Sequence, residues 1–329
     1  MAPQAASEAP AVSVIVPARN AADLLPRLLA ALDRTTFTGP WETIVVDDAS
    51  TDTTAQIAEE WGAQVVRLGA QSGPAASRNA GLGVARGPLV AFTDADCEPT
   101  PGWLAAITAA LAEADIAMGP VLPVPGVPRT PYSRTLRIEA ESPLFETANL
   151  AVRREVVDRV GGFEPFAPVA GVRTGHRPTV GEGHFGEDAV FGWRARRTGA
   201  RTAFVEEALV YHAVFPRGPR GYLAERWRLR FFPALVREIP ELRSRLTLRV
   251  FLSPNSLLFD LAAAGIAASA ITGRRGPLVA AGPYLARRVV WRNGWRRSVA
   301  RRNVAVVAGD AVALAALVRG SLAARRLLL

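Results

Sequence analysis

Three pairs of acidic residues are the side chains in this sequence best placed to do chemistry. The first pair, Asp94 and Asp96, directly follows the apolar run at residues 89–93. Carboxylates two positions apart on an extended chain point to the same side, so they can share one cation and its ligand. A hard divalent ion such as Mg²⁺ or Mn²⁺ prefers few carboxylates together with phosphate oxygens. The pair therefore indicates a metal–diphosphate site, and the alternative is a solvated loop.

The second pair, Asp47 and Asp48, ends the apolar run at residues 43–46. Adjacent carboxylates repel each other unless donors or a ligand absorb their charge. Our interpretation is that Asp48 accepts hydrogen bonds from a nucleobase or ribose. The alternative is that this segment only caps the following helix, a role that suits residues 50–52 in any case.

The third pair, Glu187 and Asp188, opens a predicted helix. A carboxylate there is kept ionised by the helix dipole and could serve as a general base, although an acidic first turn is the commoner use. His212 follows a short apolar strand and is either a metal or phosphate ligand or a buried, hydrogen-bonded histidine. Arg78 and Asn79 lie early in a predicted helix, where they could meet an anion or simply face solvent.

Strands and helices alternate along the first hundred residues. Buried strands are predicted at 12–17, 43–47, 64–67 and 89–93, with amphipathic helices between them. This alternation predicts an α/β fold in which helices flank a mostly parallel sheet and chemistry lies at the carboxyl ends of the strands. The acidic pairs at 47–48 and 94–96 follow two of those ends. Residues 120–131 contain five prolines and are predicted to be a connector without its own element.

Six segments, in order, resemble conserved blocks of the family-2 glycosyltransferases, an inverting family with the GT-A fold. They are VSVIVPARN, VVDDASTD, GPAASRNAG, FTDADCEPTPGWL, ETANLAVRREVVDRVGGFEP and GEDAVFGWRARRTG. Together they cover most of residues 12–212. The resemblance implies a Rossmann-like GT-A domain that transfers a sugar from a nucleotide-diphosphate donor to an acceptor hydroxyl.

The resemblance also implies roles for individual residues. It implies a nucleoside pocket formed by Pro17, Arg19, Asp48, Arg78 and Asn79. Asp94 would contact ribose or the metal, and Asp96 would hold Mn²⁺ or Mg²⁺ against the diphosphate. Independently of the resemblance, the position of His212 after a strand makes it a further candidate metal ligand. Asp188 would take the proton from the acceptor hydroxyl as that oxygen attacks the anomeric carbon from the opposite face.

One departure from the resemblance concerns processivity. Polymer-forming relatives carry a Gln-x-x-Arg-Trp motif, whereas this chain has Leu223 in place of the glutamine before Arg226 and Trp227. We therefore expect a single-transfer enzyme.

The charge is unevenly distributed along the chain. All 39 basic residues are arginine; residues 1–216 hold 18 of them against 25 acids, whereas residues 217–329 hold 21 against 5. We expect a glycosyltransferase domain at 10–216, with a nucleotide-binding half (10–120) and an acceptor half (121–216). A basic, apolar, α-helical extension follows at 217–329.

The apolar runs at 255–272, 277–291 and 303–318 suggest that this extension binds an anionic membrane surface. Spanning helices and a soluble helical appendage are the alternatives. No recognition motif favours nucleic acid. The single cysteine, Cys97, and the lack of a signal-peptide pattern suit a location at the cytoplasmic face of the cell membrane.

Two other functions compete with transfer of a sugar to a lipid-linked or cell-envelope glycan. A sugar-nucleotide pyrophosphorylase would need a glycine-rich phosphate loop after the first strand, where this chain has Pro17, Ala18, Arg19 and Asn20. A non-catalytic membrane-bound scaffold would have no need of the acidic pairs.

Overall fold

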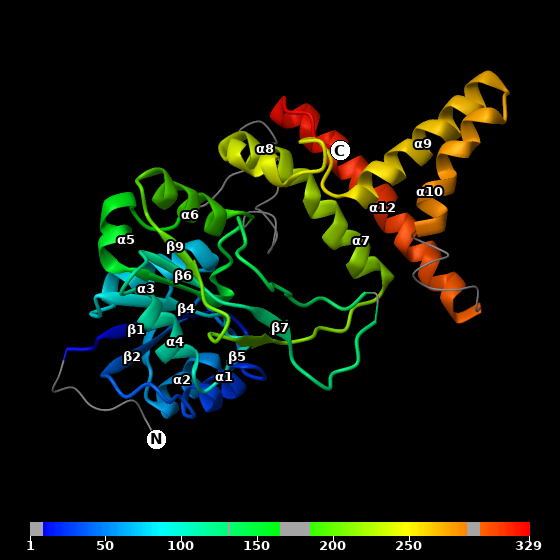
Figure 1. The fold of residues 1–329 in the computed structure, drawn as a ribbon. Coiled ribbons are helices and arrows are strands. Elements are labelled where there is room, and N and C mark those ends of the chain that lie inside the picture. The colour runs from blue at the N-terminus through cyan, green and yellow to red at the C-terminus, as the bar shows by residue number, and fades with distance from the viewer. Residues whose placement is uncertain (1–8, 131, 165–184, 288–296) are drawn as a thin grey trace. The chain divides into compact units, whose positions relative to one another are not determined.

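The computed structural model describes residues 9–130, 132–164, 185–287 and 297–329, which form two compact units (Figure 1). The first unit contains the described residues of 9–128, 135–164 and 185–215. The second contains those of 129–134 and 216–329. The short segment at 129–134 therefore belongs to the second unit, although it lies before the predicted boundary at residue 216.

The first unit is built on a seven-stranded sheet with the strand order β3-β2-β1-β4-β8-β6-β9. All neighbours are parallel except β8, which runs antiparallel to both β4 and β6. The mostly parallel sheet predicted from the sequence is thus confirmed. Its strands are β1 (Val12–Ala18), β2 (Trp41–Asp47), β3 (Gln64–Arg67), β4 (Leu89–Phe92), β6 (Ile116–Met118), β8 (Leu150–Arg153) and β9 (Thr202–Phe204).

Helices cover both faces of this sheet because successive side chains of a buried strand point to opposite sides. Val14 and Val16 of β1 belong to the core beneath one set of helices, and Ile15 belongs to the core beneath the other. The first set is α1 (Leu25–Leu32), α2 (Thr54–Trp61) and α4 (Trp103–Ala110). The second set is α3 (Pro74–Val84), α5 (Arg154–Val160) and α6 (Glu187–Arg197).

A second, three-stranded sheet completes this unit, with the order β5-β10-β7. Its strands are β5 (Cys97–Pro99), β7 (Val121–Pro123) and β10 (Val210–His212). The prediction that residues 120–131 contain no element is therefore wrong for β7, which pairs in parallel with β10. In the antiparallel β5–β10 pair, His212 lies directly opposite Cys97. This pairing brings the end of β10 to the acidic segment that precedes β5.

The second unit is helical, as predicted for the C-terminal extension. Helix α12 packs against α7, α8 and the 3₁₀ helix η2. The helices are α7 (Pro219–Trp227), η2 (Arg228–Phe231), α8 (Phe232–Glu238), η3 (Pro240–Arg245), α9 (Pro254–Thr272), η4 (Gly276–Ala281), α10 (Gly282–Leu285) and α12 (Arg297–Ala324). A further 3₁₀ helix, η1 (Thr147–Asn149), belongs to the first unit.

Candidate active site

Asp48 lies just after β2 and is held by the start of α3. Its Oδ1 accepts a hydrogen bond from the backbone N–H of Ser72 at 2.6 Å, and its Oδ2 accepts one from Gly73 at 2.9 Å. Gly73 has φ +87°, a conformation that favours glycine, and it is the residue preceding the first turn of α3. Backbone amides thus absorb the charge of Asp48, and contact of Asp48 with a nucleobase or ribose stays a prediction.

The end of β1 lies beside the Asp48 loop. Pro17 is in register with Val46 of β2, and both it and Arg19 are partly buried. The Nη1 atom of Arg19 is buried and has no hydrogen-bond partner among the described residues. A buried guanidinium N–H without an acceptor is costly. Arg19 is therefore a natural donor for a ligand that carries phosphate or carbonyl oxygens.

Arg78 on α3 connects two of the acidic pairs. Its Nη2 donates to Oδ1 of Asp94 at 3.1 Å, and its Nη1 donates to Oδ1 of Asp188 at 3.2 Å. Only 5 % of its side chain is exposed. Burial lowers the pKa of Arg78, but the carboxylates of Asp188 and Asp94 outweigh burial and leave that pKa above its ordinary value. The guanidinium of Arg78 therefore brings together two carboxylates that are 94 residues apart in sequence.

Asp188 lies in the first turn of α6 and has two further partners. Its Oδ2 accepts hydrogen bonds from the backbone N–H of Thr147 at 3.1 Å and from the Thr147 hydroxyl at 2.9 Å. Burial raises the pKa of Asp188 to about 6, against the opposing effect of Arg78. A carboxyl group with that pKa is mostly ionised at neutral pH and is still basic enough to accept a proton. This is the electrostatic state that a general base requires.

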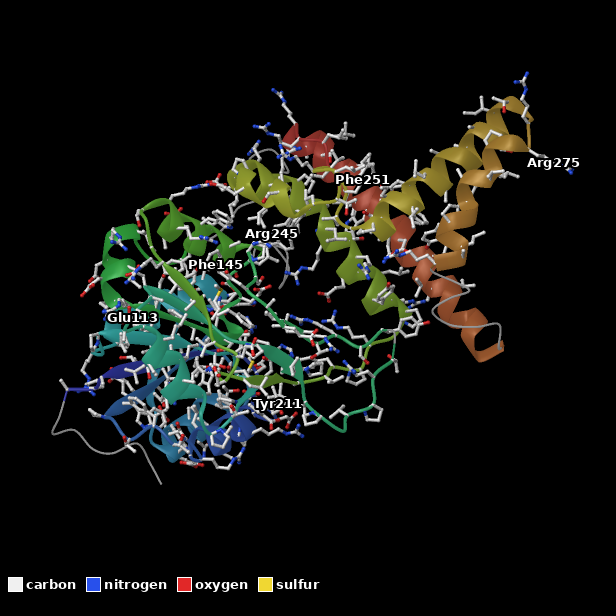
Figure 2. All side chains as sticks on the ribbon, viewed as in Figure 1. Glu113, Phe145, Tyr211, Arg245, Phe251 and Arg275 are labelled. Carbon is white, nitrogen blue, oxygen red and sulfur yellow. The ribbon has the colours of Figure 1, made fainter. Side chains whose placement is uncertain are left out.

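The turn before Thr147 is strained and tightly packed. Phe145, labelled in Figure 2, is fully buried and has φ +53°. Gly192 of α6 leaves room for its ring, because a Cβ on that glycine would lie 2.1 Å from the ring of Phe145. A non-glycine residue in the left-handed region costs about 1 kcal/mol or more and is found often at functional sites. Here the turn directs Thr147 toward the carboxylate of Asp188.

Asn79 has a structural partner in the described structure. Its Nδ2 donates to the carbonyl of Phe163 at 2.7 Å, and its Oδ1 accepts from the backbone N–H of Phe163 at 2.7 Å. The ring of Phe163 in turn lies 5.7 Å from the guanidinium carbon of Arg78. Asn79 thus fixes the segment that packs on Arg78, and its place in a nucleoside pocket stays a prediction.

Asp96 and His212 face each other through the β5–β10 pairing. Oδ2 of Asp96 lies 3.4 Å from Nε2 of His212, whose Nδ1 lies 2.7 Å from the carbonyl oxygen of Ala213. Because a carbonyl oxygen only accepts, Nδ1 carries a proton, and in the Nδ1–H tautomer Nε2 presents a lone pair to the carboxylate. The Asp96 oxygen and the His212 nitrogen are then two acceptors that face each other, an arrangement that is stabilised by a cation or a further proton between them.

This donor set fits a divalent cation. A metal-binding histidine usually donates its other ring N–H to a carbonyl, as His212 does to Ala213. Within the described residues no group of three or more acidic, histidine or cysteine side chains could hold a metal ion. Asp96 and His212 would therefore need diphosphate oxygens to complete the coordination, which is the arrangement that Mg²⁺ accepts. Asp94 is paired with Arg78, and its contact with metal or ribose stays a prediction.

Sequence reasoning did not single out two residues of this site, Thr147 and Phe163. Both lie in segments quoted for the family resemblance, but threonine and phenylalanine have no charge that would mark them as functional.

Arg226 and Trp227, the part of the processive motif that this chain retains, lie at the end of α7 in the second unit. Arg226 donates to the hydroxyl of Tyr222 at 3.3 Å.

Comparison with known proteins gives consistent similarities. A family model described as glycosyl transferase family 2 matches residues 13–167. Glycosyltransferase AglE of Haloferax volcanii is 31 % identical over 173 residues, which cover 48 % of this chain and 57 % of that protein. An uncharacterized glycosyltransferase of Mycobacterium bovis is 35 % identical over 169 residues, which cover 46 % of this chain and 75 % of that protein.

A solved structure has a similar fold. It is the mannosyltransferase PcManGT from Pyrobaculum calidifontis in complex with GDP-Man and Mn²⁺. The two chains superpose with a TM-score of 0.62 at 21 % sequence identity, covering 95 % of this chain and 88 % of the other. At that identity the likeness concerns the fold, and the predicted GT-A architecture is confirmed.

Proposed function

This chain belongs to glycosyltransferase family 2, and from that premise we propose that it is an inverting enzyme acting on a nucleotide-diphosphate sugar. The sugar passes to the hydroxyl of an acceptor in a single transfer. The observation that carries this proposal is the Arg78 bridge, which holds Asp94 of the metal motif and Asp188 on one guanidinium. This contact supports a single site for donor binding and for proton acceptance.

The donor would bind at the carboxyl ends of β1, β2 and β4. Arg19, with its unpartnered buried Nη1, is suited to an anionic or carbonyl oxygen of the nucleotide. Asp48 is held rigid by two backbone amides and can offer its remaining lone pairs to a base or ribose. Such prepositioned polar groups lower the entropic cost of placing the sugar for attack.

Asp188 would act as the general base. The acceptor O–H proton moves to a carboxylate oxygen of Asp188 while the acceptor oxygen forms a bond to the anomeric carbon. The bond from that carbon to the phosphate oxygen breaks on the opposite face, so the nucleoside diphosphate leaves and the configuration inverts. Thr147 and Arg78 keep the carboxylate in place through both of its oxygens.

Asp96 and His212 would hold Mn²⁺ or Mg²⁺. When bound, the cation would offset the charge that develops on the leaving diphosphate. The mutual approach of the Asp96 oxygen and the His212 lone pair, at 3.4 Å, supports this assignment. The solved complex of PcManGT with GDP-Man and Mn²⁺ supports it at the level of the fold.

We further propose that the enzyme works at the cytoplasmic face of the cell membrane, on a lipid-linked or cell-envelope glycan acceptor. The basic helical unit supports this location, because two helices among its described residues are long and apolar enough to cross a membrane. Leu223 in place of glutamine supports one transfer per acceptor.

A donor panel tests the proposal. The protein is heated with each of several nucleotide sugars, with and without Mn²⁺, and the melting temperature is recorded; the donors that stabilise it are then assayed for release of nucleoside diphosphate. We expect one class of donor to stabilise the protein more with Mn²⁺ and to release its nucleotide. Tight binding without turnover, with any acceptor extract, would support the scaffold alternative.

A further inference from the structure

Residues 254–287 of the second unit form a helical hairpin. Helix α9 ends at Gly273, which has φ +66°, and η4 and α10 return along it. The arms touch closely at Gly265, where a Cβ would lie 2.4 Å from the carbonyl oxygen of Pro277. At the other end, Nε of Arg287 donates to Oδ1 of Asn255 at 3.0 Å. The hairpin thus has a turn at residues 273–276, marked by Arg275 in Figure 2, and a base at Asn255.

The outer surface of the hairpin is apolar on several sides. Ile271 is 85 % exposed and Val279 is 79 % exposed, and Leu261, Ile266 and Leu285 are also exposed. On α9 the exposed positions 261, 266 and 271 are five residues apart, so they point in different directions around the helix. Large aliphatic side chains exposed around a helix in this way are unusual on a soluble monomer. A helix that lies in the membrane surface needs one charged face, and α9 contains neither arginine nor lysine.

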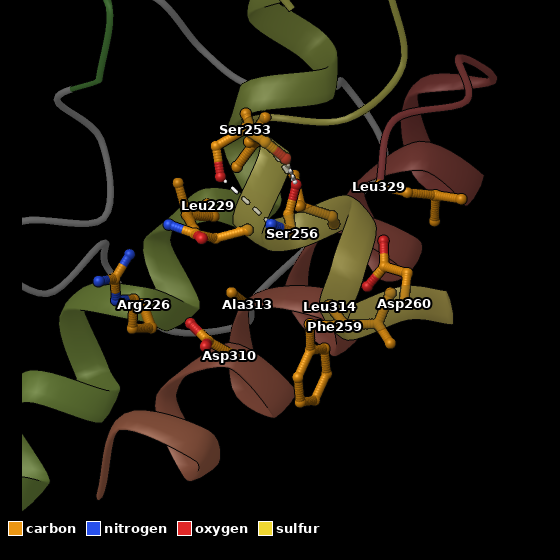
Figure 3. Close-up of a pocket in the computed structure, with 13 residues that line it drawn as sticks. Arg226, Leu229, Ser253, Ser256, Phe259, Asp260, Asp310, Ala313, Leu314 and Leu329 are labelled. Atoms are coloured by element: carbon orange, nitrogen blue, oxygen red, sulfur yellow. Dashed lines mark hydrogen bonds between the residues drawn. The ribbon is translucent and has the colours of Figure 1, made fainter. Parts of the chain in front are cut away.

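The polar side chains in the first two turns of α9 line a cavity within the unit. This cavity of about 220 Å³ is lined by Asn255, Ser256 and Asp260 of α9 and by Asp310 of α12 (Figure 3). Oδ2 of Asp310 accepts a hydrogen bond from the hydroxyl of Tyr284 at 2.7 Å. Ionisable residues of helices within a membrane usually face protein or a cavity rather than lipid. Asp260 and Asp310 therefore do not oppose insertion of the hairpin.

The length and charge of the hairpin match a bilayer. The 19 residues of α9 rise about 29 Å, close to the hydrocarbon thickness of about 30 Å. Arg274 and Arg275 lie at the turn, and residues 287–302 after the base contain seven arginines. Arginines at both ends of an apolar segment bind phosphate groups of lipids. More arginines follow the hairpin in the sequence than stand at its turn, which favours the cytoplasmic side for the end at Asn255.

We infer that this hairpin is the part of the chain that enters a bilayer containing anionic lipid, turn first, while α12 remains a core helix of the second unit. Of the most apolar 18 residues of α9, 11 % are buried inside the protein, against 28 % of the most apolar 18 residues within Val304–Ala324 of α12. Helix α12 also packs against α7, η2 and α8. Of the apolar run at 277–291, residues 288–291 lie outside the described residues. The inference rests on the membrane location proposed above and is independent of the transfer chemistry.

Depth-dependent quenching tests the inference on the full-length chain. Cysteine is introduced at Ile266 or, as a matched control, at Val127, an exposed aliphatic residue of the first unit. Each protein is labelled with a fluorescent maleimide; Cys97 is buried, and the parent protein should take no label. The proteins are mixed with phosphatidylglycerol–phosphatidylcholine vesicles that carry a nitroxide at the acyl-chain end or at the headgroup.

We expect the label at 266 to be quenched most by the acyl-chain nitroxide and the label at 127 by neither. Quenching at 266 by the headgroup nitroxide alone would show a surface helix, and no quenching would show a soluble appendage; either result overturns the inference. Ile266→Glu should weaken vesicle binding by about tenfold or more, and Val127→Glu should not. Nucleotide release in detergent should be the same for both variants, so that a failure of the proposed chemistry is distinguishable from a failure of insertion.

Discussion

Replacement of Thr147 by valine should shift the pH dependence of transfer to higher pH. Valine has nearly the shape of threonine but lacks the hydroxyl that donates to Oδ2 of Asp188 at 2.9 Å. That hydrogen bond stabilises the ionised carboxylate, so its loss raises a pKa that burial has already raised to about 6. The backbone N–H of Thr147 and the guanidinium of Arg78 remain in place.

The size of the shift follows from the strength of the lost bond. A hydrogen bond to a charged group contributes about 1.5–3 kcal/mol, and one pKa unit corresponds to about 1.4 kcal/mol. Because two other partners remain, we take the lower end and expect the pKa of Asp188 to rise by about one unit, to about 7. A base must be ionised to act, so kcat/KM should fall about threefold at pH 6.5 and be nearly unchanged at pH 8.5.

The assay is nucleotide release with donor and acceptor, measured as kcat/KM between about pH 5 and pH 9. Thr147→Ser is the matched control, because serine keeps the hydroxyl and should keep the original acid limb. If Thr147→Val lowers kcat/KM equally at every pH, the hydroxyl does not act through the protonation of Asp188. If the acid limb moves to lower pH, the electrostatic reasoning is wrong.

Four further predictions concern metal, charge and stability. Asp96→Asn should weaken the stabilisation of the donor complex by Mn²⁺ by about tenfold or more in a metal titration, because it removes a charged candidate ligand. Asn149→Ala, which removes three hydrogen bonds, two of them buried, should cost about 3 kcal/mol or more in urea unfolding. Arg78→Gln leaves Asp94 and Asp188 without their shared cation and should cost about 3–5 kcal/mol in the same measurement. The folded-state pKa of Asp188 lies above its ordinary value, so the folded state binds the Asp188 proton more tightly than the unfolded state does. The stability that this proton contributes should therefore be lost as pH rises from about 4 through about 6. Asp188→Asn should remove this part of the pH dependence of the free energy of unfolding.

Long, strongly patterned elements were predictable from the sequence. The strands at 12–18 and 41–47 are built around the apolar, β-branched runs at 14–16 and 44–46, and the strand at 64–67 has the predicted bounds. Buried parallel strands leave such runs because both of their faces are covered. The acidic pairs at 47–48 and 94–96 could be placed at one edge of the sheet, because the carboxyl ends of parallel strands meet there. Arg78 was predicted to bind an anion or to line the nucleoside pocket. Its bridge between Asp94 and Asp188 depends on tertiary packing that no local sequence pattern encodes.

The short strand before His212 was expected, but its partners β5 and β7 could not be predicted, and part of the site depends on that pairing. Strands β5 and β7 have three residues each, too few for a periodic pattern, and both end in proline. The sequence suggested Asp96 and His212 as candidate metal ligands, but only the β5–β10 pairing shows that they lie side by side. Likewise, Thr147 is made functional by the strained turn at Phe145, which follows from tertiary packing rather than from local propensity.

Asp188→Asn tests the central claim most directly, because asparagine keeps the size of the side chain and can still be held by Thr147 but cannot accept the proton. Donor affinity is measured by calorimetry with Mn²⁺, and transfer is measured in a single turnover with donor and acceptor. We predict that the variant binds the donor within about threefold of the parent and transfers at least about a thousandfold more slowly. Transfer at the parental rate, or loss of donor binding together with transfer, would contradict the assignment of Asp188 as the base.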